Sequence, residues 1–289
     1  MSETQILILD GGLGTSLEDK YGLKFTQSTP LWSSHPLVDG QRDVLLACQQ
    51  DFGRVPVDIL LSATYQVSVE AFARTKTPQH PDGISRDDMP VYLEDAVAIA
   101  EQAKQPTASI ALSLGPYGAC MVPSQEYSGR YDAAHDSEEA LHRWHRDRLE
   151  VFAKVRQLSA RTEYVAFETV PRADEIRAIR RLFRRSEQLS VCIVDNIPGS
   201  TVDELVEASF DESQSEARPW AIGINCTKLD KLEALVELYE AAVARLISNG
   251  KLQSWPALAL YPDGTKGEVY NTETKVWEVV TPQDSQSMA

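Results

Sequence analysis

Two carboxylates and a thiol stand where short apolar runs of the sequence end. Asp10, Glu168 and Cys226 each close such a run. Ionised carboxylates bind cations, and a cysteine thiolate is a nucleophile or a metal ligand. Each residue also has a simpler interpretation, because an aspartate before Gly-Gly commonly forms a turn and an isolated cysteine commonly packs as a small apolar side chain. Joint chemistry requires a fold that brings the three together.

Aromatic and amide side chains accompany these residues. Tyr65 follows the second apolar run, Tyr117 follows the third, and Tyr127 lies further along the same loop. Asn225 directly precedes the cysteine, and Trp32 lies in the long segment after the first run. If the run ends meet at one edge of a sheet, acids, a thiol and several aromatic rings converge there.

Seven apolar runs recur along the chain, with helical patterns between them. Their near-continuous hydrophobicity is typical of parallel strands buried on both faces. Residues 137–158 and 229–248 repeat apolar side chains at helical spacing, with Asp136 expected as the N-cap of the first helix and Gly250 at the end of the second. This alternation predicts a parallel α/β sheet. The runs cover residues 6–10, 58–62, 109–114, 164–168, 189–195, 220–226 and 257–261.

The polar run ends favour a barrel over an open doubly wound sheet. No GxGxxG follows the first run, whereas a β/α barrel places its active site in the loops after its strands. We therefore predict one domain over residues 1–289, a TIM-type (β/α)8 barrel that stops after its seventh strand. Residues 268–280 predict a hairpin and residues 281–289 a polar tail. Such a barrel has open edges, which the hairpin or a partner chain could cover, so homo-oligomer formation is left open.

Composition excludes several classes of partner. The chain has 28 Lys and Arg against 43 Asp and Glu, a net charge of −15, which argues against nucleic-acid and anionic-membrane partners. No run approaches the length of a membrane-spanning helix, and the N-terminus lacks the pattern of a signal peptide. The four cysteines lie far apart without a CxxC pair, which favours reduced thiols and a cytoplasmic location.

Five ordered motifs share these positions: LDGGLGT, ATYQ, LGPYGA with EYSGRY, FETVP and GINC, after the first, second, third, fourth and sixth runs. Together they resemble the homocysteine S-methyltransferase family, from about residue 6 to about residue 265. The ATYQ and EYSGRY forms are most similar to the branch that uses S-methylmethionine or S-adenosylmethionine. The resemblance implies an enzyme that transfers a methyl group from a sulfonium donor to the thiolate of homocysteine, giving methionine.

The resemblance also implies roles for the residues at the run ends. The family holds one zinc ion through three cysteines, and Cys226 matches the first of them, with Asn225 beside it. Zinc would deprotonate the homocysteine thiol and hold its sulfur for attack. Asp10 and Glu168 match the acids that would hold the amino group of homocysteine. Our own candidates for aromatic faces near the sulfonium, which attracts electron-rich rings, are Trp32, Tyr65, Tyr117 and Tyr127.

One part of the family pattern is missing from these 289 residues. No Gly-Gly-Cys-Cys segment is present, no cysteine follows Cys226 and no histidine follows His145. A catalytic zinc normally takes three protein ligands, so this chain is expected to bind zinc weakly. Two hypotheses follow: an active methyltransferase, or a catalytically impaired relative that keeps the amino-acid pocket without the zinc site. A truncated sequence, a splice form and a natural loss would each account for the difference.

Overall fold

A parallel sheet forms the centre of the molecule. The computed structural model describes residues 6–26, 28–183, 189–193, 201–213, 215, 217–264, 268–271 and 276–279. Six strands pair in sequence order, each parallel to the next. Before them, Leu9 forms an isolated parallel bridge to Ile59. The strands are β1 (Ile59–Leu61), β2 (Ser109–Leu114), β3 (Tyr164–Phe167), β4 (Leu189–Ile193), β5 (Ala221–Lys228) and β6 (Ala257–Asp263).

All seven predicted apolar runs lie in this sheet, the first of them through its bridge. The predicted parallel α/β arrangement is therefore confirmed. Within the described residues the strands form one row from the Leu9 bridge to β6, and no pairing closes that row into a barrel. The predicted hairpin is also confirmed, because β7 (Glu268–Asn271) pairs antiparallel with β8 (Val276–Val279). The polar tail at 281–289 lies outside the described residues.

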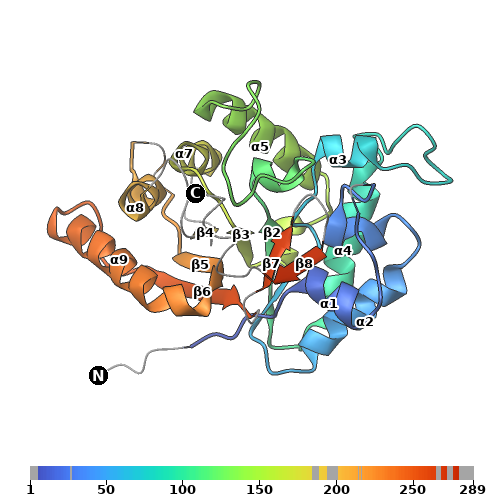
Figure 1. The fold of residues 1–289 in the computed structure, drawn as a ribbon, viewed down its shortest axis with the longest axis horizontal. Coiled ribbons are helices and arrows are strands. Elements are labelled where there is room, and N and C mark those ends of the chain that lie inside the picture. Colours follow the sequence, from blue (N-terminus) through green and yellow to red (C-terminus); the bar gives the residue numbers. More distant parts are fainter. Residues whose placement is uncertain are drawn as a thin grey trace.

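Helices surround the strands (Figure 1). The α-helices are α1 (Leu13–Asp19), α2 (Arg42–Gly53), α3 (Val69–Arg74), α4 (Met89–Ala103), α5 (Glu138–Phe152), α6 (Leu158–Arg161), α7 (Ala173–Arg180), α8 (Val202–Phe210) and α9 (Leu229–Ser248). Neighbouring helices pack as α2 on α4, α5 on α7, α7 on α8 and α8 on α9. Two 3-10 turns, η1 (Trp32–Leu37) and η2 (Tyr117–Cys120), lie in the loops. Among the described residues, no helix combines the length and apolar character needed to cross a bilayer.

Successive strand residues are buried on opposite faces of the sheet. Leu112 and Phe167 belong to the main core beneath the helices, whereas their neighbours Ala111 and Ala166 belong to a separate apolar cluster. Side chains of a strand point alternately to its two faces, so both faces of the sheet are covered. This two-sided burial explains why the sequence shows continuous apolar runs instead of alternation.

One of the two predicted helices has the expected bounds, and the other differs from the sequence pattern at both of its ends. The segment 229–248 is one helix, and Gly250 follows its C-cap with a φ of +71°, a conformation that glycine adopts freely. The segment 137–158 instead ends its first helix at Phe152. The predicted N-cap Asp136 is wrong: Ser137 accepts the capping bond from the amide of Ala140, and Asp136 pairs with Arg172.

Candidate functional site

The ends of β3, β5 and β6 come together through side-chain contacts. Glu168 directly follows β3, and its carboxylate accepts a hydrogen bond from the Tyr261 hydroxyl of β6 at 3.2 Å. Thr169 follows it, and its amide donates to the Asn225 side chain of β5 at 3.2 Å. Cys226 is the next residue of β5. Because parallel strands end at one edge, the fold places these groups together where the sequence predicted.

Asp10 lies next to this group and has spare hydrogen-bonding capacity. Its Oδ2 accepts from the Leu61 amide at 3.0 Å, whereas its buried Oδ1 has no hydrogen-bond partner in the part of the chain that the structure describes. Burial raises the pKa of Asp10 well above its ordinary value, and the negative charge of Glu168 adds to the increase. A buried carboxylate with a free oxygen favours a cationic ligand, because a positive charge would offset its desolvation.

Glu168 is a second buried acid with a raised pKa. Only 6% of its surface is exposed, and its other oxygen accepts a hydrogen bond from the Ser113 hydroxyl of β2. Burial raises its pKa to about 7, although the hydrogen bonds from Ser113 and Tyr261 oppose the increase. Two such carboxyls close enough to influence each other form a site that would accept one positive charge.

Cys226 is surrounded by polar side chains. The Asn225 amide nitrogen donates to its sulfur at 3.4 Å, the Thr169 hydroxyl lies 3.8 Å from it, and Tyr127 also hydrogen-bonds to it. The side chain retains solvent-accessible surface, yet burial raises its pKa to about 12, with the negative charge of Glu126 as the next cause. Solvent therefore reaches part of the thiol while protein atoms surround the rest. At neutral pH the unligated Cys226 is a thiol.

Thr169 and Cys226 share an uncommon backbone conformation. Their φ angles are +59° and +52°, and with Trp32 and Gln157 they make up the non-glycine residues of the described chain that have positive φ. This region is costly for residues with a Cβ, most of all for a β-branched one such as threonine. The Asn225 side chain holds the pair, since its Nδ2 also donates to the Thr169 hydroxyl at 2.7 Å. Such outliers concentrate at functional sites.

The loops after β1 and β2 bring further groups to the same place. The Tyr65 hydroxyl donates to Glu126 at 2.7 Å, and the adjacent Tyr127 reaches Cys226. Tyr127 is 43% exposed, but burial together with the Cys226 and Glu126 charges raises its pKa well above the ordinary value. The Glu126 carboxylate, which was quoted in the sequence motif without a role, is thus part of the site.

Tyr117 and Trp32 lie elsewhere around the site. The Tyr117 ring stacks on His135 with centroids 4.2 Å apart, and its hydroxyl donates to Asp132. Its polar end is therefore engaged outside the group around Cys226. Trp32 packs against the start of α1, where a Cβ on Gly14 would come within 2.5 Å of its ring. Glycine at position 14 therefore allows the tryptophan to sit against the turn that follows Asp10.

Sequence reasoning missed Thr169, Ser113 and Tyr261. Thr169 was visible within the FETVP motif, next to a predicted acid. Ser113 sits inside an apolar run, where it resembles an ordinary strand residue, and Tyr261 simply ends the last run. Both become site residues only because parallel strands align their ends, so the sheet register and not the local sequence identifies them.

The described side chains that hydrogen-bond to Cys226 do not complete a zinc site. They are an amide, a threonine hydroxyl and a phenol, whereas zinc sites are built from thiolates, imidazoles and carboxylates. Among the described residues, no group of three or more His, Cys, Asp or Glu side chains could hold a metal. The expected weak zinc binding stays a prediction.

We expect the purified 289-residue chain to retain far less than one zinc ion per chain after dialysis, because a single thiolate cannot complete the site. Elemental analysis by plasma mass spectrometry would measure the ratio. A Cys226→Ser variant serves as control and should contain the same small amount. One tightly held ion per wild-type chain that disappears in the variant would contradict the expectation.

The chain is similar to known proteins along most of its length. A family model described as "Homocysteine S-methyltransferase" matches residues 7–284. Homocysteine S-methyltransferase YbgG of Bacillus subtilis is 28% identical over 94% of this chain and 81% of its own length. The homocysteine S-methyltransferase of Escherichia coli is 28% identical over 96% and 83%, respectively. A selenocysteine Se-methyltransferase of Brassica oleracea is 28% identical over 93% and 75%.

A solved structure has the same fold. The metallated form of the homocysteine methyltransferase MmuM from Escherichia coli matches with a TM-score of 0.68 and 23% sequence identity. The match covers 91% of this chain and 93% of that one, so the arrangement of strands and helices is shared along almost the whole length. A second structure of MmuM, in an oxidized form, matches to the same extent.

Proposed function

The chain belongs to the homocysteine S-methyltransferase family, and from that premise we propose that it transfers a methyl group from a sulfonium donor to homocysteine, giving methionine. The named relatives from Bacillus subtilis and Escherichia coli support this activity. The observation that carries the proposal in this chain is the pair of acids Asp10 and Glu168: Glu168 is buried, and Asp10 is half-buried with a buried, unpartnered Oδ1 among the described residues.

The two acids suit the ammonium group of an amino acid. Their raised pKa values come mainly from burial without a compensating charge. An ammonium group placed against Asp10 Oδ1 would supply both the missing hydrogen bond and the missing charge, and would bring both pKa values down. The influence of Glu168 on Cys226 indicates that the two lie near each other. An amino acid anchored by its ammonium would therefore extend its sulfur toward Cys226.

Tyr127 and Tyr65 suit the cationic donor. Tyr127 contacts Cys226 while keeping an accessible face, and Tyr65 is held beside it through Glu126. An aromatic face attracts a sulfonium by about 0.5–2 kcal/mol. The carboxylate of Glu126 adds negative charge at the same place. S-methylmethionine and S-adenosylmethionine are both sulfonium donors, and the ATYQ and EYSGRY motifs resemble the branch that uses either of them. We propose S-methylmethionine as the preferred donor.

The reaction is a displacement at the methyl carbon. The homocysteine sulfur forms the new carbon–sulfur bond, the bond to the donor sulfur breaks, and its electron pair leaves with a neutral thioether. The thiol proton passes to solvent. The residues of this chain orient the two sulfur atoms and exclude water, and correct placement of two reactants lowers the barrier of such a step. In the family a bound zinc ion supplies thiol deprotonation, and the residues that would have to hold it are not assembled in the described part of this chain.

The site is proposed to lie in a single domain of a cytoplasmic protein. We propose that residues 1–289 act as one domain with the strand order of a TIM-type barrel, which the shared fold with MmuM supports. Cys48, Cys120 and Cys226 are free thiols, which supports a cytoplasmic location. Whether two copies associate is left open.

An assay with homocysteine and each donor tests the function. We expect methionine to form faster with S-methylmethionine than with S-adenosylmethionine, and added zinc to raise the rate if the metal is weakly held. Calorimetry with homocysteine alone separates the two hypotheses. Binding without turnover with either donor, at any zinc concentration, would favour the impaired relative. Absence of binding would contradict the proposed pocket.

A further inference from the structure

The segment that carries Glu126 and Tyr127 forms a compact turn. The amides of Ser128 and Gly129 both donate to the Gln125 carbonyl, at 3.2 and 2.9 Å, and the Gln125 amide donates to the Gly118 carbonyl at 2.9 Å. Tyr127 is held within this turn and reaches Cys226 from it. Gly129 ends the turn with a φ of +62°, so a side chain there would be strained. The position of Tyr127 therefore depends on what holds Gly129.

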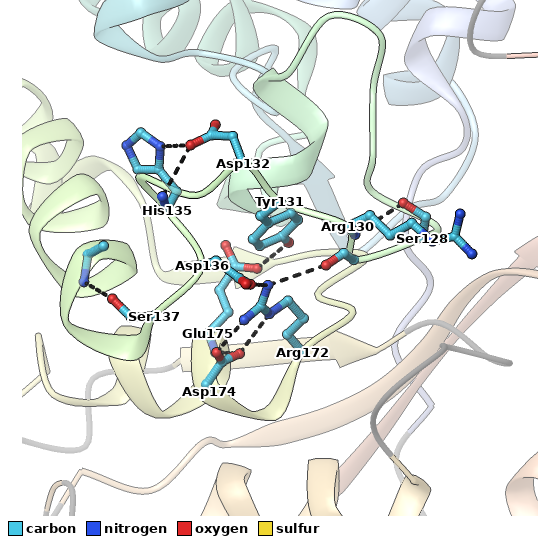
Figure 2. A network of polar contacts seen from close by, with 12 residues as sticks. Ser128, Arg130, Tyr131, Asp132, His135, Asp136, Ser137, Arg172, Asp174 and Glu175 are labelled. Atoms are coloured by element: carbon cyan, nitrogen blue, oxygen red, sulfur yellow. Dashed lines mark hydrogen bonds and ion pairs between the residues drawn. The ribbon is translucent and has the colours of Figure 1, made fainter.

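Arg172 holds the far side of this turn. Its Nη1 donates to the Gly129 carbonyl at 3.3 Å and to the carboxylate of Asp136 at 2.5 Å, while its Nε and Nη2 form a two-pronged pair with Asp174. The guanidinium also lies over the Tyr131 ring, 4.8 Å from its centroid. Figure 2 shows the guanidinium between the two aspartates with the loop residues around it. One side chain thus binds the loop at two points, Gly129 and Asp136.

The backbone of Arg172 connects these contacts to the site. The residue lies three positions after Thr169, in the short segment from the end of β3 to α7. That segment carries Glu168 and Thr169, whose contacts reach Tyr261 and Cys226. A movement of the loop relative to Arg172 would therefore be a movement of Tyr127 relative to the acids and the thiol.

We propose that Arg172 is a positioning residue that fixes Tyr127 against Cys226 and so sets the affinity for the sulfonium donor. The inference rests on the proposed function, because the donor is the ligand that Tyr127 would face. Asp10 and Glu168 are held by other contacts, from Leu61, Ser113 and Tyr261, so the affinity for homocysteine should not depend on Arg172.

The chain offers a matched control at the opposite end of the same strand. Arg161 ends α6, three positions before the start of β3, and its guanidinium forms a two-pronged pair with Glu101 and a further ion pair with Glu94. Its side chain is 15% exposed, against 17% for Arg172. The two arginines therefore have comparable local roles, but Arg161 contacts α4 and not the loop that carries Tyr127.

The test compares Arg172→Gln with Arg161→Gln. Arg172→Lys keeps the charge without the planar fork, and Asp136→Asn weakens only the contact with the far end of the loop. We expect Arg172→Gln to raise the donor KM about tenfold with the homocysteine KM changed less than twofold, because displacing a binding group by about 1 Å is costly. Arg172→Lys should restore part of the loss, and Arg161→Gln should change neither KM.

Two further measurements do not depend on turnover. Hydrogen–deuterium exchange of amides 125–136 should be faster in Arg172→Gln and Asp136→Asn than in the wild type and in Arg161→Gln. Alkylation of Cys226 by iodoacetamide, followed by peptide mass spectrometry, should also be faster at a fixed pH, because Tyr127 would cover the sulfur less. If Arg172→Gln fails to fold, exchange and alkylation measured on Asp136→Asn still test the inference.

The outcomes separate this inference from the proposed function. Equal effects of the Arg172 and Arg161 substitutions on the donor KM would mean that Arg172 has only a general structural role, and would overturn the inference. Unchanged exchange of amides 125–136 together with unchanged alkylation of Cys226 would also overturn it. An equal rise of both KM values would also overturn it. If the wild type makes no methionine, the proposed function fails, and exchange and alkylation alone then decide whether Arg172 positions Tyr127.

Discussion

Asp10→Asn is expected to lower kcat/KM for homocysteine about 100-fold while leaving the protein at least as stable as the wild type. Removing one partner of a buried charge pair costs roughly 2–5 kcal/mol of binding free energy. The asparagine keeps the acceptor for the Leu61 amide, so the fold loses no backbone hydrogen bond. Steady-state kinetics measures the first effect, and urea denaturation measures the second.

The expected stability of Asp10→Asn follows from the upward shift of the Asp10 pKa in the folded protein. The folded pKa of Asp10 is raised, so the folded state binds its proton more tightly than the unfolded state does. The free energy of unfolding must then fall as pH rises from the ordinary value of the acid toward the folded pKa. Asparagine does not ionise and removes that loss. The variant should therefore show a smaller decrease in stability between pH 4 and pH 7 than the wild type.

Asp58 provides the control for this prediction. It accepts the Ile8 amide at 2.8 Å, at the opposite end of the same strand pair, and its side chain is exposed. Asp58→Asn should leave the KM for homocysteine unchanged. Equal kinetic losses in both variants would mean that Asp10 acts through the strand pairing and does not contact the substrate.

Glu175→Ala is expected to destabilise the protein by about 3–5 kcal/mol, because it leaves a buried charge without compensation. Glu175 is fully buried and accepts three hydrogen bonds, from the Tyr117 amide at 2.7 Å, from His145 at 2.8 Å and from the Tyr131 hydroxyl at 2.5 Å. Behind His145 lies Arg148, 1% exposed, which donates to the imidazole Nδ1 at 3.0 Å. The carboxylate balances that cation through the imidazole.

The same contacts fix the protonation of His145. Because Arg148 donates to Nδ1, the hydrogen of the neutral ring lies on Nε2 and points to Glu175. Burial lowers the pKa of His145 to about 4, so the ring stays neutral at physiological pH. Arg148 also donates to the Gly115 carbonyl at 3.0 Å, which extends the network to the turn after β2. Loss of Glu175 would thus loosen the loops on which Tyr117 and Tyr131 lie.

Chemical denaturation of Glu175→Ala, Glu175→Gln and Glu138→Ala measures this effect. Glu138 also joins α5 to α7, through an ion pair with Arg177, but it is partly exposed and should contribute less than about 1 kcal/mol. Glutamine at 175 keeps one acceptor oxygen and should fall between the other two. A loss below 1 kcal/mol in Glu175→Ala would show that water or a rearranged side chain replaces the carboxylate.

The strands were predictable from the sequence because their burial on both faces leaves a continuous apolar signal. Asp10, Glu168 and Cys226 were predictable as a group for a related reason, since parallel strands align their ends. The N-cap at Ser137 was not predictable, because the adjacent Asp136 is an equally good cap and the choice depends on Arg172, which is distant in sequence. The orientation of Tyr117 was likewise set by contacts with Asp132 and His135.

Within the described residues, the groups of the proposed amino-acid site assemble without a set of zinc donors beside them. The motifs up to Cys226 come together as expected, so the proposed amino-acid site could be predicted from them. The metal depends on residues that would converge from elsewhere, and the described neighbours of the thiol are Asn225, Thr169 and Tyr127. A motif reports descent, whereas coordination requires the full set of donors within reach of one point.

The left-handed backbone at Thr169 and Cys226 has an evolutionary consequence. Glycine would adopt these φ angles without the penalty of about 1–3 kcal/mol that other residues carry. Selection for stability alone would therefore be expected to drift both positions toward glycine. A chain that keeps a threonine and a cysteine there gives up part of its mutational tolerance, since less stability is left to absorb later substitutions elsewhere.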